Sequence, residues 1–228
     1  MRKGKLLNRK KDIIKTIERI SGKYSAYEVF SDWIKCMAMA ISNTVTPFHG
    51  KLWKEREEMY MNTINKYSPC ERESFCDMTA MLAETLDDGP DDVLGAIYME
   101  SGMGSKAAGQ FFTPFQLSEL CARLSVEDLT KEGPDGKIHL SEPSCGAGGM
   151  IIAVAKVLQD AGINYQDELR VVAQDLDWKG VYMCYVQLSF LGINAICVQG
   201  DTLTEPYDPK RTRLSQMLFT PAKMGLLI

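Results

Sequence analysis

Apolar side chains in the first hundred residues recur every three or four positions, the spacing that lines one face of a helix. The stripes run over residues 13–20, 29–41, 75–86 and 93–98. Asp87–Pro90 supplies the acidic, glycine and proline residues that end the third stripe. We therefore expect a helical region over residues 1–105 whose apolar faces build a core, and we assign it no chemistry.

A further helix is predicted to begin within Thr113–Gln116. Thr113 suits the N-cap and Pro114 the first helical position, where a proline costs no hydrogen bond. The expected buried face of this helix comprises Leu117, Leu120, Cys121 and Leu124.

Beyond residue 133, short apolar runs alternate with helical stripes. The predicted elements are strands over 138–140, 170–174 and 195–199, a helix after residue 149 and a helix over 178–191. The buried face of the first of these helices comprises Ile151, Val154, Ala155 and Leu158. This alternation predicts an α/β protein with a parallel βαβαβ sheet. Such units bind nucleotides beyond the carboxyl ends of their strands.

The segment Ser141–Gly149, with the sequence SEPSCGAGG, joins the first strand to the helix after it. Gly146 and Gly148 carry no Cβ, so the backbone can turn sharply and a ligand can lie against it. Backbone N–H groups at the start of the next helix favour an anionic group such as a carboxylate. The third glycine of the dinucleotide fingerprint is absent, which argues against NAD. A tight strand-to-helix turn without a ligand is the alternative interpretation.

Glu142-Pro143 before this turn adds a resemblance to a known family. The order Asp/Glu-Pro-x-x-Gly-x-Gly-Gly is similar to the cofactor motif of amino-methylating DNA methyltransferases, and most similar to the modification subunits of type I restriction–modification systems. The resemblance implies a partial Rossmann-like methyltransferase fold with S-adenosyl-L-methionine as the cofactor. The residues of this segment that the resemblance places at the cofactor are Glu142, Ser144, Gly146, Gly148 and Gly149.

Gln110–Pro114 resembles a second motif of the same family, one that packs over the methionine end of the cofactor. The resemblance implies cofactor contacts from Phe111, Phe112, Thr113 and Pro114. A buried aromatic pair before a capped helix is the alternative for this segment.

Two acidic residues follow the second and third predicted strands. A carboxylate at the end of such a strand can accept hydrogen bonds from ribose hydroxyls, and the resemblance implies this role for Asp175, with Leu176 against the adenine. Asp177 suits the N-cap of the next helix. The resemblance places Asp201 at the exocyclic amine of the adenine, although an isolated Gly-Asp pair is also an ordinary turn.

The target-base motif of the family, Asn/Asp/Ser-Pro-Pro-Tyr/Phe after a fourth strand, is not found in this sequence. In the family it accepts hydrogen bonds from the target amine and stacks on the flipped base. Glu205–Asp208 shares only a proline and a tyrosine with it, and Thr220–Ala222 is no closer. The apolar residues 224–228 are the expected fourth strand. We therefore assign no catalytic residue and expect a truncated methyltransferase-like domain over residues 106–228.

The chain carries a formal charge of −4 and lacks the global basic field that draws proteins onto nucleic acid. We expect DNA contacts through a local patch or a partner subunit. Two basic segments are candidates, residues 2–11 and Lys210–Arg213, for which a solvated tail and a surface loop are the alternatives. A homodimer or hetero-oligomer that covers the exposed edge of the sheet is also expected.

Seven scattered cysteines without a Cys-x-x-Cys pair, and only two histidines, argue against a zinc site and a disulfide framework. The N-terminus lacks the apolar stretch of a signal peptide, and no apolar run is long enough to span a bilayer. We therefore expect a soluble cytoplasmic protein that binds no metal.

Three functions remain open from the sequence. The first is an adenine-N6 DNA methyltransferase, or the cofactor-binding part of one, in a restriction–modification-like system. The second is an inactive regulatory or accessory module that binds S-adenosyl-L-methionine, and the third is a relic of the fold that serves as an interaction protein. Cofactor binding separates the first two from the third, and methyl transfer to DNA separates the first from the second.

Overall fold

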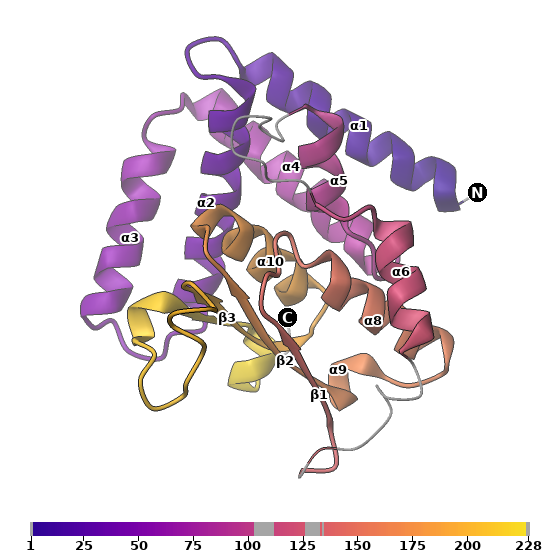
Figure 1. Ribbon diagram of the computed structural model, residues 1–228. Helices are drawn as coiled ribbons and strands as arrows, with labels where there is room; N and C mark the ends of the chain where they lie inside the picture. The colour runs from indigo at the N-terminus through magenta and orange to yellow at the C-terminus, as the bar shows by residue number, and fades with distance from the viewer. Residues whose placement is uncertain (1, 103–111, 126–132, 134, 227–228) are drawn as a thin grey trace.

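The structure is a computed structural model that describes residues 2–102, 112–125, 133 and 135–226, with side chains from residue 8 onward. Phe111, which was expected at the cofactor, lies outside the described residues. Figure 1 shows the N-terminal helices packed over a small sheet and its covering helices.

The N-terminal half is helical, as predicted. Its helices are α1 (Arg2–Ile20), α2 (Ala26–Thr44), α3 (Lys51–Ile64), α4 (Pro69–Asp87) and α5 (Val93–Glu100). Ser25 and Ser68 begin α2 and α4 through reciprocal capping bonds with Glu28 and Glu71. These bonds satisfy backbone N–H groups that no helical carbonyl can reach.

The predicted parallel βαβαβ unit is confirmed. Its elements are β1 (Ile138–Glu142), α8 (Gly149–Asp160), α9 (Tyr165–Glu168), β2 (Leu169–Asp175), α10 (Trp178–Phe190) and β3 (Asn194–Gln199). The strands lie in the order β1-β2-β3 and pair in parallel. Because both crossovers step in the same direction, α8 and α10 share one side of the sheet. This side faces the N-terminal helices (Figure 1).

The fourth strand differs from the prediction. β4 is Met217–Phe219, not residues 224–228, and it pairs antiparallel with β3. The short 3-10 helices η1 (Leu214–Gln216) and η2 (Pro221–Met224) flank it. Residues 225 and 226 belong to no strand, and 227 and 228 lie outside the described residues.

Thr220 gives the physical reason for the position of β4. Its side chain is fully buried, and its hydroxyl accepts a hydrogen bond from Ala195 N (2.9 Å) and donates one to Ile193 O (2.7 Å). These bonds hold the chain at the amino end of β3. Thr220–Ala222 therefore lies at the amino ends of the parallel strands, away from their carboxyl ends.

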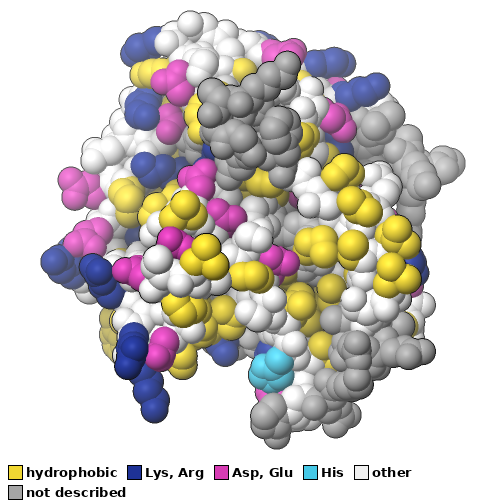
Figure 2. Space-filling view, viewed as in Figure 1, with side chains coloured by type: hydrophobic (Ala, Val, Ile, Leu, Met, Phe, Trp, Pro, Cys, Tyr) yellow, Lys and Arg dark blue, Asp and Glu magenta, His cyan; other side chains and the backbone are white. Residues whose placement is uncertain are grey.

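Helix α6 (Phe115–Leu124) corrects two further expectations. Pro114 occupies the N-cap and no side chain caps the helix, so Thr113 is not the cap. The side chains expected to be buried are exposed: Leu117 by 49%, Leu120 by 52% and Leu124 by 78%, together with Cys121. Figure 2 shows the apolar side chains gathered over this helix.

The face of α6 that packs against α8 carries small residues instead. Ser118 and Ala122 are buried there, because small side chains let two helices approach closely. Glu119 on the same helix pairs with Lys156 of α8 at 2.8 Å. The apolar spacing of α6 identified the helix correctly and its buried face wrongly.

One connected core joins the helical half to the sheet. Helix α10 packs against α2 on its outer side. Lys179 of α10 donates to the hydroxyl of Tyr27 (3.0 Å) and lies 5.0 Å from the ring centroid of Tyr98. Arg56 of α3 donates to Met217 O in β4 (3.1 Å) from a buried position. The N-terminal helices thus contact the α/β unit at two places, helix α10 and strand β4.

Thr220→Val should destabilise the protein by about 1–3 kcal/mol, because it leaves Ala195 N without its buried acceptor and Ile193 O without its donor. Urea unfolding followed by circular dichroism measures the difference. Thr204→Val is the control, because Thr204 is exposed and should change stability by less than about 0.5 kcal/mol. Equal stability of the two variants would contradict the role given to Thr220.

Candidate functional site

The glycine turn connects the carboxyl end of β1 to α8. Cys145 donates its backbone N–H to Gln174 O in β2 (2.9 Å), and Gly148 donates to Cys145 O (2.7 Å). Gly146 and Gly148 have φ angles of 50° and 94°, a conformation that favours glycine. Gly148 is the N-cap of α8 and supplies no side-chain cap. The first N–H groups of α8 are therefore left for another acceptor.

Phe112 packs directly on this turn. A Cβ added to Gly146 would lie 2.8 Å from the Phe112 ring, so the glycine also permits a close aromatic contact. The same ring lies 5.2 Å from the ring of Tyr98 in α5, centroid to centroid. Thr113 and Pro114 follow with exposed side chains. The aromatic segment and the glycine turn, predicted to act together, are in contact.

Asp175 braces the turn from the end of β2. Its Oδ2 accepts a hydrogen bond from Gly146 N (2.8 Å), and its Oδ1 accepts one from Asp177 N (2.9 Å). The first of these bonds was not foreseen from the sequence. A carboxylate has about four acceptor sites, so Asp175 keeps capacity for the hydroxyls of a ligand.

The loops after β2 and β3 border the same edge of the sheet. Leu176 is 67% exposed, so its side chain is available to a ligand. Asp201 accepts a hydrogen bond from Leu203 N (2.9 Å) and thereby forms a turn. Thr202 donates its hydroxyl to Pro143 O (2.6 Å), which ties this loop to the segment before the glycine turn.

Glu142 and Ser144 form the bend between β1 and the glycine turn. Glu142 Oε1 accepts a hydrogen bond from Ser144 N at 3.1 Å, and the Ser144 side chain is exposed. Glu142 is half-buried at the carboxyl end of β1, in line with Ala173 of β2. These two residues shape the chain as it enters the turn.

A buried polar network, which the sequence did not predict, lies next to the turn. Gln187 of α10 donates from Nε2 to Ala147 O (2.8 Å) and to Asp92 Oδ1 (2.9 Å), and its Oε1 accepts from Leu94 N (2.9 Å). Gln187 is 0% exposed and Asp92 4%. Buried hydrogen bonds are costly to break, so the network fixes α5, α10 and the turn against one another. An aspartate directly before a helical stripe is a possible N-cap, which is the position that Asp92 takes before α5, but nothing in the sequence pairs it with Gln187.

Asp177 is the N-cap of α10, as predicted, and accepts from Lys179 N (3.1 Å). The Lys179 ammonium lies against this cap at 3.4 Å from Asp177 Oδ2. Burial by itself lowers the pKa of Lys179. Hydrogen bonds to Tyr27 and Tyr98, and the charge of Asp177, outweigh burial and raise that pKa above its usual value. Lys179 is therefore a charged link between the helical half and the edge of the site.

The two segments compared with the target-base motif lie at opposite ends of the parallel strands. Gln174 holds Glu205–Asp208 near the carboxyl end of β2, because it donates to Glu205 O (2.8 Å) and accepts from Tyr207 N (2.9 Å). Thr220–Ala222 lies at the opposite end. Neither segment carries the polar residue followed by two prolines that defines the motif.

The cavities in the part of the chain that the structure describes include two of different size. The larger, of about 930 Å³, lies between the α4–α5 connection and helices α6 and α8. Its walls include Asp92, Gly95, Met99, Phe112, Pro114 and Lys156. Phe112 therefore belongs both to this cavity and to the glycine turn.

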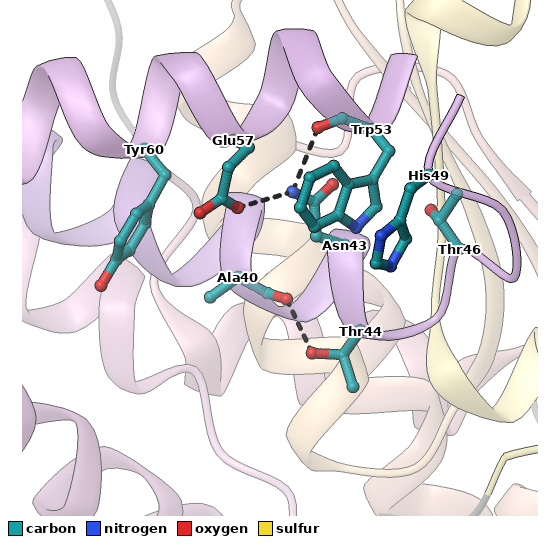
Figure 3. A pocket seen from close by; sticks show the side chains of 8 residues that line it. All are labelled: Ala40, Asn43, Thr44, Thr46, His49, Trp53, Glu57 and Tyr60. Carbon is teal, nitrogen blue, oxygen red and sulfur yellow. Dashed lines mark hydrogen bonds between the residues drawn. The ribbon is translucent and has the colours of Figure 1, made fainter. Parts of the chain in front are cut away.

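The smaller cavity, of about 370 Å³, is a groove between α2 and α3 (Figure 3). The rings of His49 and Trp53 stack there at 4.1 Å. Asn43 donates to both Trp53 O (3.3 Å) and Glu57 Oε2 (3.1 Å), as the dashed lines in Figure 3 show. Most of these contacts join the two helices, so the groove is a helix–helix junction.

The described residues contain no group of three or more His, Cys, Asp or Glu side chains arranged to hold a metal ion. Among the helices that the structure describes, none is long and apolar enough to cross a membrane.

The parallel unit, the glycine turn at the start of α8 and the carboxylate at the end of β2 define a nucleotide-cofactor domain of the Rossmann-like methyltransferase type. The chain belongs to the N-6 DNA methylase family, whose sequence model matches residues 90–220, more than half of the chain. S-adenosyl-L-methionine is the cofactor of this family. The matched region begins two residues before Asp92 and so includes α5.

Type II methyltransferase M.BanIII from Aneurinibacillus aneurinilyticus is 26% identical over 105 residues, which are 45% of this chain and 18% of that protein. The chain thus spans less than a fifth of the length of this relative. A putative class I S-adenosylmethionine-dependent methyltransferase from Listeria monocytogenes has a similar structure, with a TM-score of 0.48 and 9% identity over 82% of this chain and 52% of that one. No function is assigned from that likeness.

Gly146→Ala should destabilise the protein by roughly 1–3 kcal/mol more than Gly162→Ala does. Both glycines have positive φ, but a Cβ at Gly146 meets the Phe112 ring whereas a Cβ at Gly162 meets nothing within 4 Å. The pair therefore separates the ring contact from backbone strain. Thermal and urea unfolding of both variants measure the difference, and equal losses would mean that Phe112 does not constrain the turn.

Proposed function

We propose that this chain is the S-adenosyl-L-methionine-binding part of a DNA adenine-N6 methyltransferase in a restriction–modification-like system. The observation that supports this most is the bond from Gly146 N to Asp175 Oδ2, because it joins the two motifs that resemble the cofactor pocket. Phe112 completes the arrangement by packing on Gly146. The family match supports the methyltransferase class, and the DNA substrate is part of our proposal.

In this proposal the adenosine end lies along the carboxyl edge of the sheet. Asp175 accepts hydrogen bonds from the ribose hydroxyls with its remaining acceptor sites. Leu176 contacts the adenine with its exposed side chain, and Asp201 accepts from the exocyclic amine. The methionine end lies at Gly146–Gly149, where the first N–H groups of α8 suit its carboxylate.

The bound cofactor supplies the methyl group, and the chain supplies binding and orientation. Transfer to an amine also needs an acceptor that positions the target nitrogen and stabilises the developing charge, each worth several kcal/mol. We propose that a partner subunit or a further segment provides this acceptor. An inactive S-adenosyl-L-methionine-binding regulatory or accessory module is the second candidate, favoured by the missing Asn-Pro-Pro-Tyr/Phe motif.

The partner surface that we propose is the free edge of β1. Within the described strands, β1 pairs with β2 alone. An unpaired strand edge offers backbone groups to another chain, so a second copy or another subunit can cover it. The exposed residues Lys210, Arg211 and Arg213, in the loop after β3, are the candidate DNA contacts. We keep residues 1–105 and 106–228 as the proposed helical and cofactor-binding regions.

Isothermal titration of S-adenosyl-L-methionine into the purified protein should show saturable binding that Asp175→Ala weakens at least tenfold, because ribose acceptors and the brace on Gly146 are both lost. Asp77→Ala is the control, since Asp77 is exposed on α4. Asp175→Asn, which keeps one acceptor oxygen, should bind with intermediate affinity. If the folded wild-type protein does not bind, the cofactor role fails and an interaction role remains.

Transfer of a labelled methyl group from S-adenosyl-L-methionine to DNA should be absent or weak with the isolated chain, because it lacks the target-amine acceptor. Candidate partner subunits are then added in the same assay. Transfer that appears only with a partner supports a methyltransferase completed by that partner. Efficient transfer by the isolated chain would contradict the expectation and show that an unrecognised segment supplies the acceptor.

A further inference from the structure

Asp92 lies in the wall of the larger cavity, close to Gly95 and Gly149. The residue lines this cavity and is only 4% exposed. Its Oδ1 accepts from Gly95 N and from Gln187 Nε2, both at 2.9 Å. Its Oδ2 accepts no hydrogen bond from any residue that the structure describes, so one acceptor of a nearly buried carboxylate is left for a ligand.

The position of Oδ2 relates this acceptor to α8. A Cβ added to Gly149, the first residue of α8, would lie 3.0 Å from Asp92 Oδ2. The carboxylate therefore lies beside the uncapped N-terminus of a 12-residue helix. A helix N-terminus attracts negative charge, while a carboxylate attracts positive charge. The two features side by side suit a ligand that carries an ammonium and a carboxylate group on one carbon atom.

Among the described residues no lysine or arginine forms an ion pair with Asp92, although the charge of Lys10 lowers its pKa. The nearby Lys10 ammonium pairs with Asp91 at 2.7 Å instead. Burial raises the pKa of Asp92, and hydrogen bonds from Gln187 and Gly95 oppose that rise. An anion in such a place costs free energy unless it is paired, so a cationic group that enters the cavity gains a strong partner.

We infer that the Asp92 carboxylate binds the α-ammonium group of the amino-acid end of S-adenosyl-L-methionine, while the N-terminus of α8 takes the neighbouring carboxylate. The inference rests on the proposed cofactor role and adds the residue that reads the amino group. Phe112 lines the cavity and also contacts Gly146, so the same ring borders both the amino-acid end and the turn. Gln187 acts as the positioning residue that fixes Asp92 Oδ1.

Asp92→Asn separates this role from the structural one. The asparagine Oδ1 can still accept from Gly95 N and Gln187 Nε2, so the network that supports the turn is kept. Its Nδ2 replaces the free oxygen and donates where the ammonium needs an acceptor. Asp91→Asn is the matched control, because Asp91 is the neighbouring residue, lines the same cavity and is paired with Lys10.

The experiment compares two ligands, S-adenosylhomocysteine and its analogue without the amino group, by isothermal titration. The wild-type protein and Asp91→Asn should each bind the deaminated analogue at least tenfold more weakly than they bind S-adenosylhomocysteine, because the analogue cannot form the charge-assisted hydrogen bond. Asp92→Asn should bind S-adenosylhomocysteine at least tenfold more weakly than the wild type. The variant should also bind both ligands with similar affinity, since the coupling between Asp92 and the amino group has been removed.

Four results would overturn the inference. Equal affinities of the wild-type protein for both ligands would show that the amino group is not read, and this result stands even if Asp92→Asn does not fold. Wild-type affinity of the folded variant for S-adenosylhomocysteine, or an equal loss for both ligands, would show that Asp92 does not contact the amino group. Failure of the wild type to bind either ligand would instead remove the proposed function, and the inference with it.

Discussion

The geometry of this protein depends on the hydrogen bonds of one buried side chain, Gln187. Its amide joins three segments far apart in the chain: α5 through Leu94 and Asp92, α10 on which it lies, and the glycine turn through Ala147. An amide has both donors and an acceptor, so one side chain can satisfy all three without a charge of its own. In a dry interior each of these bonds is costly to lose. These bonds fix the turn to α5 and α10.

A second set of contacts, from Asp175 and Phe112, fixes the turn at Gly146. Asp175 accepts from Gly146 N, and the Phe112 ring packs where a side chain at Gly146 would stand. Positive φ at Gly146 and Gly148 lets the backbone lie between these two layers. The turn is therefore preorganised by α5, α10 and β2 together. Because α5 and Phe112 lie outside the βαβαβ unit, the site depends on segments before the sheet as well as on the sheet.

The carboxyl and amino ends of the parallel strands hold different segments of the chain, and this explains which segments can take part in chemistry. Bonds from Gln174 draw the loop after β3 toward the carboxyl edge, where the glycine turn and Asp175 lie. Thr220 holds the chain after β4 at the amino end of β3. The antiparallel course of β4 thus removes Thr220–Ala222 from the site. The free edge of β1 is where the described sheet can be extended.

The sequence by itself determined the order and type of most elements, because the helical and strand periods and the glycine turn depend on near neighbours in the chain. It predicted neither helix α3 nor the position of β4. It also determined the family resemblance and most of the residues around the turn. Only the tertiary structure decided that Ser118 and Ala122, and not the leucines, face α8, and that β4 runs antiparallel from Met217. It likewise decided that Asp92 meets Gln187. Each of these outcomes depends on contacts between residues distant in sequence, which local patterns do not encode.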